Sequence, residues 1–184
     1  MFKTIIKPTL VLMLICAVVS GLLAFTYNAA GVADLANAGL KGEELAEAAP
    51  VALPGSTNLK VAKTSLKDDK VLTVYTDEGG TGSAFFVSVK GYKEGLKMLV
   101  GIAPDGTVAG IYISENQETN GIGTKALKPE YLAQFVGKSG TVAVEKSGGD
   151  VDAISGATYT SKGVGNGVNA ALAAYEQVKG ELAQ

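Results

Sequence analysis

The chain of 184 residues carries 16 basic and 18 acidic side chains, so its net charge is close to neutral, −2. Its basic residues are all lysines and are scattered along the chain. The clustered basic face that is typical of a nucleic-acid-binding protein is therefore excluded. With no His and the single Cys16, the chain lacks the residues for a zinc site, a His-ligated haem, an iron–sulfur cluster, a Ser-His-Asp triad or an internal disulfide. Any redox group must come from outside the amino-acid side chains, and no metal site is predicted.

Residues 1–30 predict a cytoplasmic tip followed by one transmembrane helix. Thr9 to Ala30 is uncharged and, at a rise of 1.5 Å per residue, reaches about 33 Å, enough for a hydrocarbon core of ~30 Å. Lys3 and Lys7 precede the span, so the N-terminus is expected in the cytoplasm and the C-terminal part outside. A cleaved signal peptide is the competing interpretation, although its apolar region is usually only ~7–15 residues long.

Residues 31–58 predict a connector, because the segment is rich in Ala, Gly and Glu. Its apolar residues fit a broken helix that continues from the anchor, with Pro50 and Pro54 as stop signals. We interpret the connector as a solvated stalk.

Residues 59–184 predict an α+β domain in which helices pack against an antiparallel sheet. Strands are predicted at 71–75, 83–90, 96–103, 107–113 and 142–144, and helices at 129–136 and 161–178. Between the third and fourth strands, Pro104-Asp-Gly106 predicts a hairpin turn, because Pro fixes one φ and Gly supplies a positive φ.

The loop from Asn116 to Lys125 directly follows the fourth predicted strand. Gly121 and Gly123 alternate there with polar or small residues, so the backbone can come close to a ligand. Taken alone, a polar glycine loop of this kind is more often an ordinary connection.

The stretch from Asp152 to Ser161 predicts a tight polar turn that leads into a helix. Thr160 or Ser161 fits the N-cap, so Thr158 is expected just outside a helix N-terminus, where a phosphate is favoured. An ordinary capped turn is the alternative. One apolar stripe marks the helix: Val164, Val168, Leu172 and Tyr175. Three glycines leave one side of its first turns bare for a flat group or a backbone: Gly163, Gly165 and Gly167.

The run Asp152-Ala-Ile-Ser155-Gly156-Ala157-Thr158 resembles the flavinylation motif of the FMN-binding domain family. In that family a flavin transferase moves FMN from FAD onto the last Thr of the motif, and the product is a phosphodiester. The resemblance implies that Thr158 carries covalent FMN. It also implies that Ser155, Gly156 and Ala157 form the recognition core and that Asp152 is the acidic residue the transferase expects.

The resemblance extends over about residues 91–175. Residues 116–123 resemble the family's His-x-Glu-Thr-Pro-Gly-Leu-Gly loop, which packs against the flavin ring. Asn116 and Asn120 replace the family's His and Pro, so we expect a less stiff loop. Any role of the family's His in tuning the flavin is not assigned to Asn116. The implied cofactor-binding residues are Glu118, Thr119, Gly121, Ile122, Gly123 and Lys125.

Within the family, the chain resembles the G subunit of Rnf complexes, which are membrane ferredoxin:NAD oxidoreductases coupled to Na+ or H+ movement. The resemblance implies an electron-carrying, single-pass membrane subunit that is not a complete enzyme by itself. Its implied partners are the flavin transferase and the other membrane subunits. Two alternatives stay open: a stand-alone extracellular flavin electron-transfer protein, and a membrane-anchored binding module without redox function.

Overall fold

The computed structural model describes residues 9, 11–13, 15–22, 39–66, 68–146 and 148–182. The chain divides into two units, Met1–Ala38 and Gly39–Gln184. In the first unit, the described residues are helical and exposed. Much of the transmembrane helix predicted at residues 9–30 lies outside the described residues, and within the described part no helix is long and apolar enough to cross a membrane.

The second unit is built on a five-stranded antiparallel sheet whose strands follow one another in chain order. The strands are β1 (Leu59–Val61), β2 (Val71–Asp77), β3 (Ser83–Val89), β4 (Leu96–Ile102) and β5 (Val108–Glu115). The predicted hairpin between β4 and β5 is confirmed, and Gly106 has the positive φ of 84° that the turn requires. The predicted α+β class is therefore confirmed.

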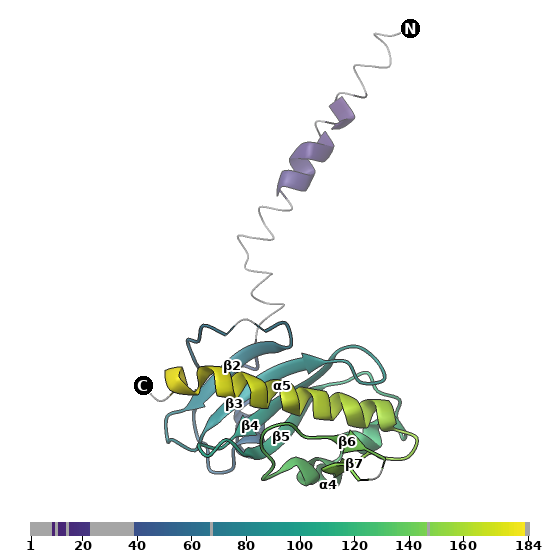
Figure 1. Ribbon diagram of the computed structural model, residues 1–184. Coiled ribbons are helices and arrows are strands. Elements are labelled where there is room, and N and C mark those ends of the chain that lie inside the picture. The colour runs from purple at the N-terminus through teal and green to yellow at the C-terminus, as the bar shows by residue number, and fades with distance from the viewer. Residues whose placement is uncertain are drawn as a thin grey trace. The chain divides into compact units, whose positions relative to one another are not determined.

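Helices cover both faces of this sheet. Helix α5 (Thr158–Leu182) runs across one face, as Figure 1 shows, and packs on Phe85 and Val87 of β3. Helix α3 (Gly42–Ala52) packs on the opposite face, in the same core cluster as Phe86. Because both faces are buried, β3 and β4 are apolar almost throughout instead of alternating.

The stalk interpretation is wrong for residues 39–58, which belong to the folded unit. Helix α3 lies so close to the sheet that a Cβ on Gly101 would collide with the carbonyl oxygen of Ala52. The small side chain of alanine suits a helix in this position. The Tyr75 hydroxyl donates a 3.0 Å hydrogen bond to the Leu40 carbonyl, and burial raises the pKa of Tyr75 to about 12. Pro50 does not stop the helix, since α3 continues to Ala52.

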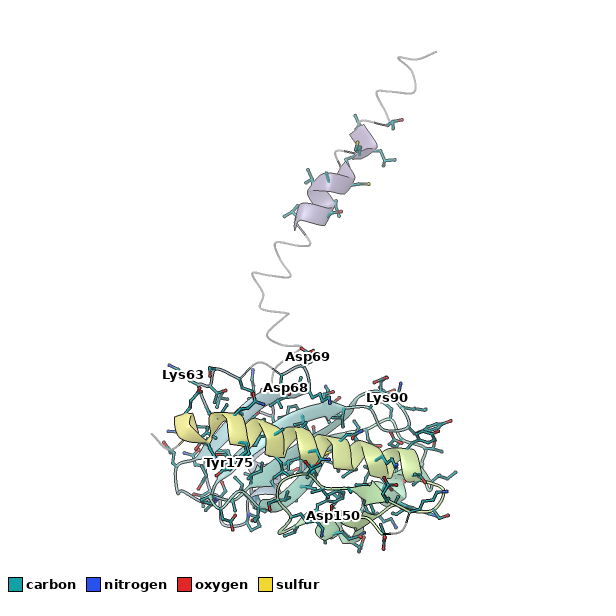
Figure 2. The ribbon with its side chains drawn as sticks, viewed as in Figure 1. Lys63, Asp68, Asp69, Lys90, Asp150 and Tyr175 are labelled. Carbon is teal, nitrogen blue, oxygen red and sulfur yellow. The ribbon has the colours of Figure 1, made fainter. Side chains whose placement is uncertain are left out.

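Several short elements follow the sheet: η1 (Gly123–Leu127), α4 (Pro129–Leu132), η2 (Ala133–Phe135), β6 (Val144–Glu145) and β7 (Val151–Asp152). The strand predicted at 142–144 corresponds to β6 and does not join the main sheet. It pairs in parallel with β7 in a separate two-stranded sheet. The Asp150 carboxylate, labelled in Figure 2, holds the β6–β7 connection by accepting a 2.8 Å hydrogen bond from the Ala143 amide.

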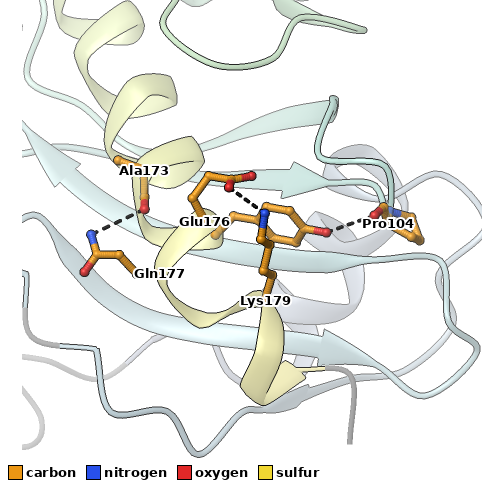
Figure 3. A network of polar contacts seen from close by, with 6 residues as sticks. Pro104, Ala173, Glu176, Gln177 and Lys179 are labelled. Carbon is orange, nitrogen blue, oxygen red and sulfur yellow. Dashed lines mark hydrogen bonds and ion pairs between the residues drawn. The ribbon is translucent and has the colours of Figure 1, made fainter.

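The predicted stripe on α5 is confirmed, since Val164, Val168 and Leu172 are buried. Further along the helix, the Tyr175 hydroxyl donates a 3.0 Å hydrogen bond to the Pro104 carbonyl of the β4–β5 hairpin (Figure 3). The Tyr175 ring also packs edge-on against Phe85, with 6.3 Å between centroids. These contacts fix the C-terminal half of α5 to the sheet.

The three glycines at the start of α5 serve close packing within the protein. A Cβ on Gly163 would lie 2.7 Å from the Gly91 Cα, and one on Gly167 would lie 2.9 Å from the Met98 sulfur. A Cβ on Gly165 would collide with the side chain of Val144. The bare side therefore accepts a backbone and side chains, and no flat group has room there.

Asp77 fastens the β2–β3 turn to the segment before β1. Its buried carboxylate accepts hydrogen bonds from the Ser56 hydroxyl at 2.8 Å and from the amide and hydroxyl of Thr81 at 3.2 and 2.9 Å. Burial disfavours the charged form, but these hydrogen bonds outweigh burial and hold the pKa of Asp77 below its ordinary value of 3.8.

Asp77→Ala is expected to lower the free energy of unfolding at pH 7 by about 1–3 kcal/mol, because it leaves buried donors without an acceptor. Since the folded pKa lies below the unfolded one, the contribution of Asp77 is fully present above pH 3.8 and is lost as the pH falls through the folded pKa. Urea unfolding at pH 7 and at pH 3 measures both effects. Asp69→Ala, at the exposed carboxylate labelled in Figure 2, is the control; an equal loss in both variants would contradict the role of Asp77.

Candidate functional site

A cavity of about 360 Å³ opens where three segments of the folded unit meet. These segments are the β3–β4 connection, the loop after β5, and the start of α5 with the turn before it. They are distant in sequence, and the packing of α5 on the sheet brings them together. The cavity is lined by Tyr92, Glu118, Thr119, Ile122, Gly123, Gly156, Ala157, Tyr159 and Thr160.

The loop after β5 is braced by its own polar groups. The Asn116 side-chain oxygen accepts a 3.3 Å hydrogen bond from the Glu118 amide. Gly121, with a φ of 74°, donates its amide to the Thr124 hydroxyl at 2.9 Å, and the Thr124 amide bonds to the Thr119 carbonyl at 3.3 Å. These bonds hold the loop around Asn120 in shape.

The Glu118 carboxylate is buried between the three segments, with 8% of the residue exposed. One oxygen accepts hydrogen bonds from the amides of Tyr92 and Lys93 at 3.0 and 3.2 Å. The other accepts a 2.5 Å hydrogen bond from the Thr160 hydroxyl. The side chain therefore lines the cavity while both of its oxygens are bonded to the protein.

Helix α5 begins at Thr158, so the predicted start at Ser161 and the predicted caps are wrong. Gly156 has a φ of 83°, which lets the chain turn directly into the helix, and the Ser161 amide donates to the Ala157 carbonyl at 2.9 Å. The Ser161 hydroxyl lies inside the helix and accepts a 3.1 Å hydrogen bond from the Ile154 amide. The two hydroxyl residues predicted as caps make tertiary contacts instead.

Thr158 is the first residue of α5 and is half-buried. It stands between Ala157 and Tyr159, which both line the cavity, although its own side chain is not part of the lining. The first amides of a helix have no partner within the helix, and the helix dipole adds positive potential there. This end of α5 is thus suited to a phosphate on the Thr158 oxygen.

Three of the side chains that line the cavity are large, hydrophobic and exposed. Tyr92, Ile122 and Tyr159 expose 60%, 52% and 73% of their surface, and the two tyrosine rings lie 6.3 Å apart between centroids. Sequence reasoning did not assign Tyr92, Tyr159 or Thr160 to the site. Tyr159 had a signal in the sequence, because it is an aromatic residue directly after the last residue of the motif, Thr158.

The structure brings only part of the predicted site into contact with the cavity. Glu118, Thr119, Ile122 and Gly123 line it together with Gly156 and Ala157 of the motif. Five predicted residues lie outside the lining: Gly121, Lys125, Asp152, Ser155 and Thr158. Asp152 is exposed at the end of β7. Burial raises the pKa of Tyr131, and the charge of the Asp152 carboxylate raises it further.

Comparison with known proteins places this site in a family. The FMN-binding domain family matches residues 91–173, which include all three segments around the cavity. The chain is 32% identical to the G subunit of the Na(+)-translocating ferredoxin:NAD(+) oxidoreductase complex of Acetobacterium woodii, with 96% of this chain and 94% of that protein covered. The chain belongs to the family of G subunits of Rnf-type ion-translocating oxidoreductase complexes.

A second member of this G-subunit family comes from the ion-translocating oxidoreductase complex of Methanosarcina acetivorans. It is 31% identical, with 92% of this chain and 94% of that protein covered. Among solved structures, the crystal structure of Shewanella oneidensis NqrC matches with a TM-score of 0.47 and 23% identity over 79% of this chain and 78% of that one.

Proposed function

We propose that the chain is the electron-carrying flavoprotein subunit of an Rnf-type membrane complex and that it carries FMN covalently on Thr158. The observation behind the proposal is the position of Thr158 at the first residue of α5, between two residues that line a cavity of about 360 Å³. The motif residues before Thr158 and the loop after β5 meet at this cavity. Membership of the G-subunit family supports the assignment.

The residues present fit FMN. The cavity volume of about 360 Å³ falls within the range of small-molecule sites, roughly 300–1,000 Å³. Exposed aromatic and aliphatic side chains are suited to the flat apolar ring, and we assign this contact to Tyr92, Ile122 and Tyr159. The phosphate would lie at the N-terminus of α5. When bound, FMN supplies the capacity to take up and release electrons, and the protein supplies orientation and electrostatics.

Attachment uses the Thr158 hydroxyl. In the transfer from FAD, the Thr158 oxygen forms a bond to the phosphorus of the FMN half. The bond between the two phosphates breaks, AMP leaves, and the hydroxyl proton goes to a base or to solvent. A covalent link keeps the effective concentration of the flavin at the millimolar scale or above, whatever its intrinsic affinity. This matters for a domain outside the membrane, where lost FMN would be diluted.

The proposed partners are a flavin transferase and the other membrane subunits of the complex. The uncharged stretch from Thr9 to Ala30 is proposed as the anchor, with residues 1–8 in the cytoplasm and the flavin domain outside. Electron transfer would be coupled to movement of Na+ or H+. The names of the relatives include both ions: Na(+) for Acetobacterium woodii, and a proton for a Clostridium ljungdahlii protein that is 39% identical over 87 residues.

The proposal predicts a specific mass for the intact chain. Full-length chain made together with a flavin transferase should weigh one FMN minus one water more than its amino acids. Chain made without the transferase should have the mass of its amino acids alone. The loaded chain should also show a flavin absorption band that is bleached by a reductant and restored by air. A loaded preparation without the added mass would contradict the covalent link.

A further inference from the structure

One carboxylate joins the three segments that form the cavity. The two oxygens of Glu118 bond to the β3–β4 connection through the Tyr92 and Lys93 amides and to α5 through the Thr160 hydroxyl. Glu118 itself belongs to the third segment, the loop after β5. The β3–β4 connection, this loop and the first turn of α5 are thereby held at one point.

At two positions beside this carboxylate, a side chain would meet its oxygens. A Cβ on Gly91 would collide with one oxygen of Glu118, and a Cβ on Gly123 would lie 2.8 Å from the other. The same Cβ on Gly123 would lie 3.0 Å from the Thr160 hydroxyl oxygen. Two glycines on two different segments therefore lie directly against the carboxylate, and each faces one of its oxygens.

The charge of Glu118 is balanced by hydrogen bonds instead of by a cation. Among the described residues, none of the ion pairs includes Glu118. Three donors point at this carboxylate, which has little contact with solvent. The cavity wall thus contains a fixed negative charge in a poorly solvated place.

We propose that Glu118 is a positioning residue that holds the three segments of the cavity together, and that its charge lowers the reduction potential of the flavin bound there. The second half rests on the proposed function. A flavin that takes up an electron gains negative charge, and a fixed negative charge at the cavity wall opposes that gain. The effect is strong because the group is buried and is weakly screened by salt.

Two substitutions separate shape from charge. Glu118→Gln keeps an oxygen for the Tyr92 and Lys93 amides, and its NH2 group can donate to the Thr160 oxygen, so shape is kept and charge is removed. Glu118→Ala removes the acceptors. The matched control is Glu94→Gln, which removes a carboxylate that is 75% exposed, pairs with Lys90 and also lies in the β3–β4 connection.

The test uses the full-length chain and two measurements. In chain without flavin, Glu118→Ala should speed hydrogen exchange of the Tyr92 and Lys93 amides at least tenfold, whereas Glu94→Gln should leave it unchanged. In chain whose FMN loading has been verified by mass, Glu118→Gln should shift the flavin midpoint potential to a more positive value than either wild type or Glu94→Gln.

A Glu118→Gln potential equal to that of wild type, or unchanged exchange in Glu118→Ala, overturns the proposal. Because Glu118→Gln keeps the shape, its potential decides the proposal even if the alanine variant does not fold. Failure of the proposed function would be seen separately, as absence of covalent FMN in the wild-type chain.

Discussion

Thr158→Ala is expected to abolish covalent FMN completely while the domain stays folded. The substitution removes the oxygen that would carry the phosphate and leaves the start of α5 without any new steric clash. The hydroxyls of Thr160 and Ser161 are poor substitutes, since both residues are buried and are bonded to Glu118 and Ile154. Flavin fluorescence of the band in a denaturing gel, from cells that also make the transferase, measures the loss.

Thr158→Ser is the matched control, because it keeps an oxygen at the same place and should retain the fluorescent band. The far-UV circular dichroism of Thr158→Ala should equal that of wild type, which separates loss of the acceptor from loss of the fold. Wild-type fluorescence in Thr158→Ala would show that another residue carries the flavin.

Gly163→Ala is expected to lower the free energy of unfolding by about 1–3 kcal/mol, as overpacking does. The added Cβ would lie 2.7 Å from the Gly91 Cα and 2.8 Å from the Lys90 carbonyl oxygen. Both contacts are with backbone, so α5 must move away from the β3–β4 connection. Since Tyr92 follows Gly91 directly, the same movement opens the cavity, and the fraction of chain loaded with FMN should fall.

Gly180→Ala, in the same helix, is expected to raise the free energy of unfolding. A Cβ there meets nothing within 4 Å, so the gain in helix propensity, up to about 1 kcal/mol, is not offset by a clash. Urea unfolding of the two full-length variants measures the difference in free energy. Equal stabilisation of both would contradict the close approach of α5 to Gly91.

Local patterns predicted the parts of the fold that local forces determine. The β4–β5 hairpin follows from Pro104 and Gly106, whose backbone preferences act within four residues. The strand β3 follows from the composition of residues 83–90, and the α5 stripe follows from the 3.6-residue period of a helix. None of these predictions needed a distant partner.

The errors arose where a distant partner decides the structure. The alanine-rich sequence of α3 looks like a solvated stalk until the glycines of β4 and β5 let it dock on the sheet. The predicted start of α5 is too late because Ser161 suits a cap, whereas in the structure its hydroxyl accepts a hydrogen bond from the Ile154 amide. Glu118 was named from resemblance, but its hydrogen bonds to Tyr92 and Thr160 appear only after folding.

The most direct measurement is tandem mass spectrometry of peptides from full-length chain made with the flavin transferase. We expect one FMN, less one water, on Thr158 within the peptide that contains Ser155 and Gly156. A modification on any other residue, or a peptide of unmodified mass in a preparation that is yellow, would contradict this expectation.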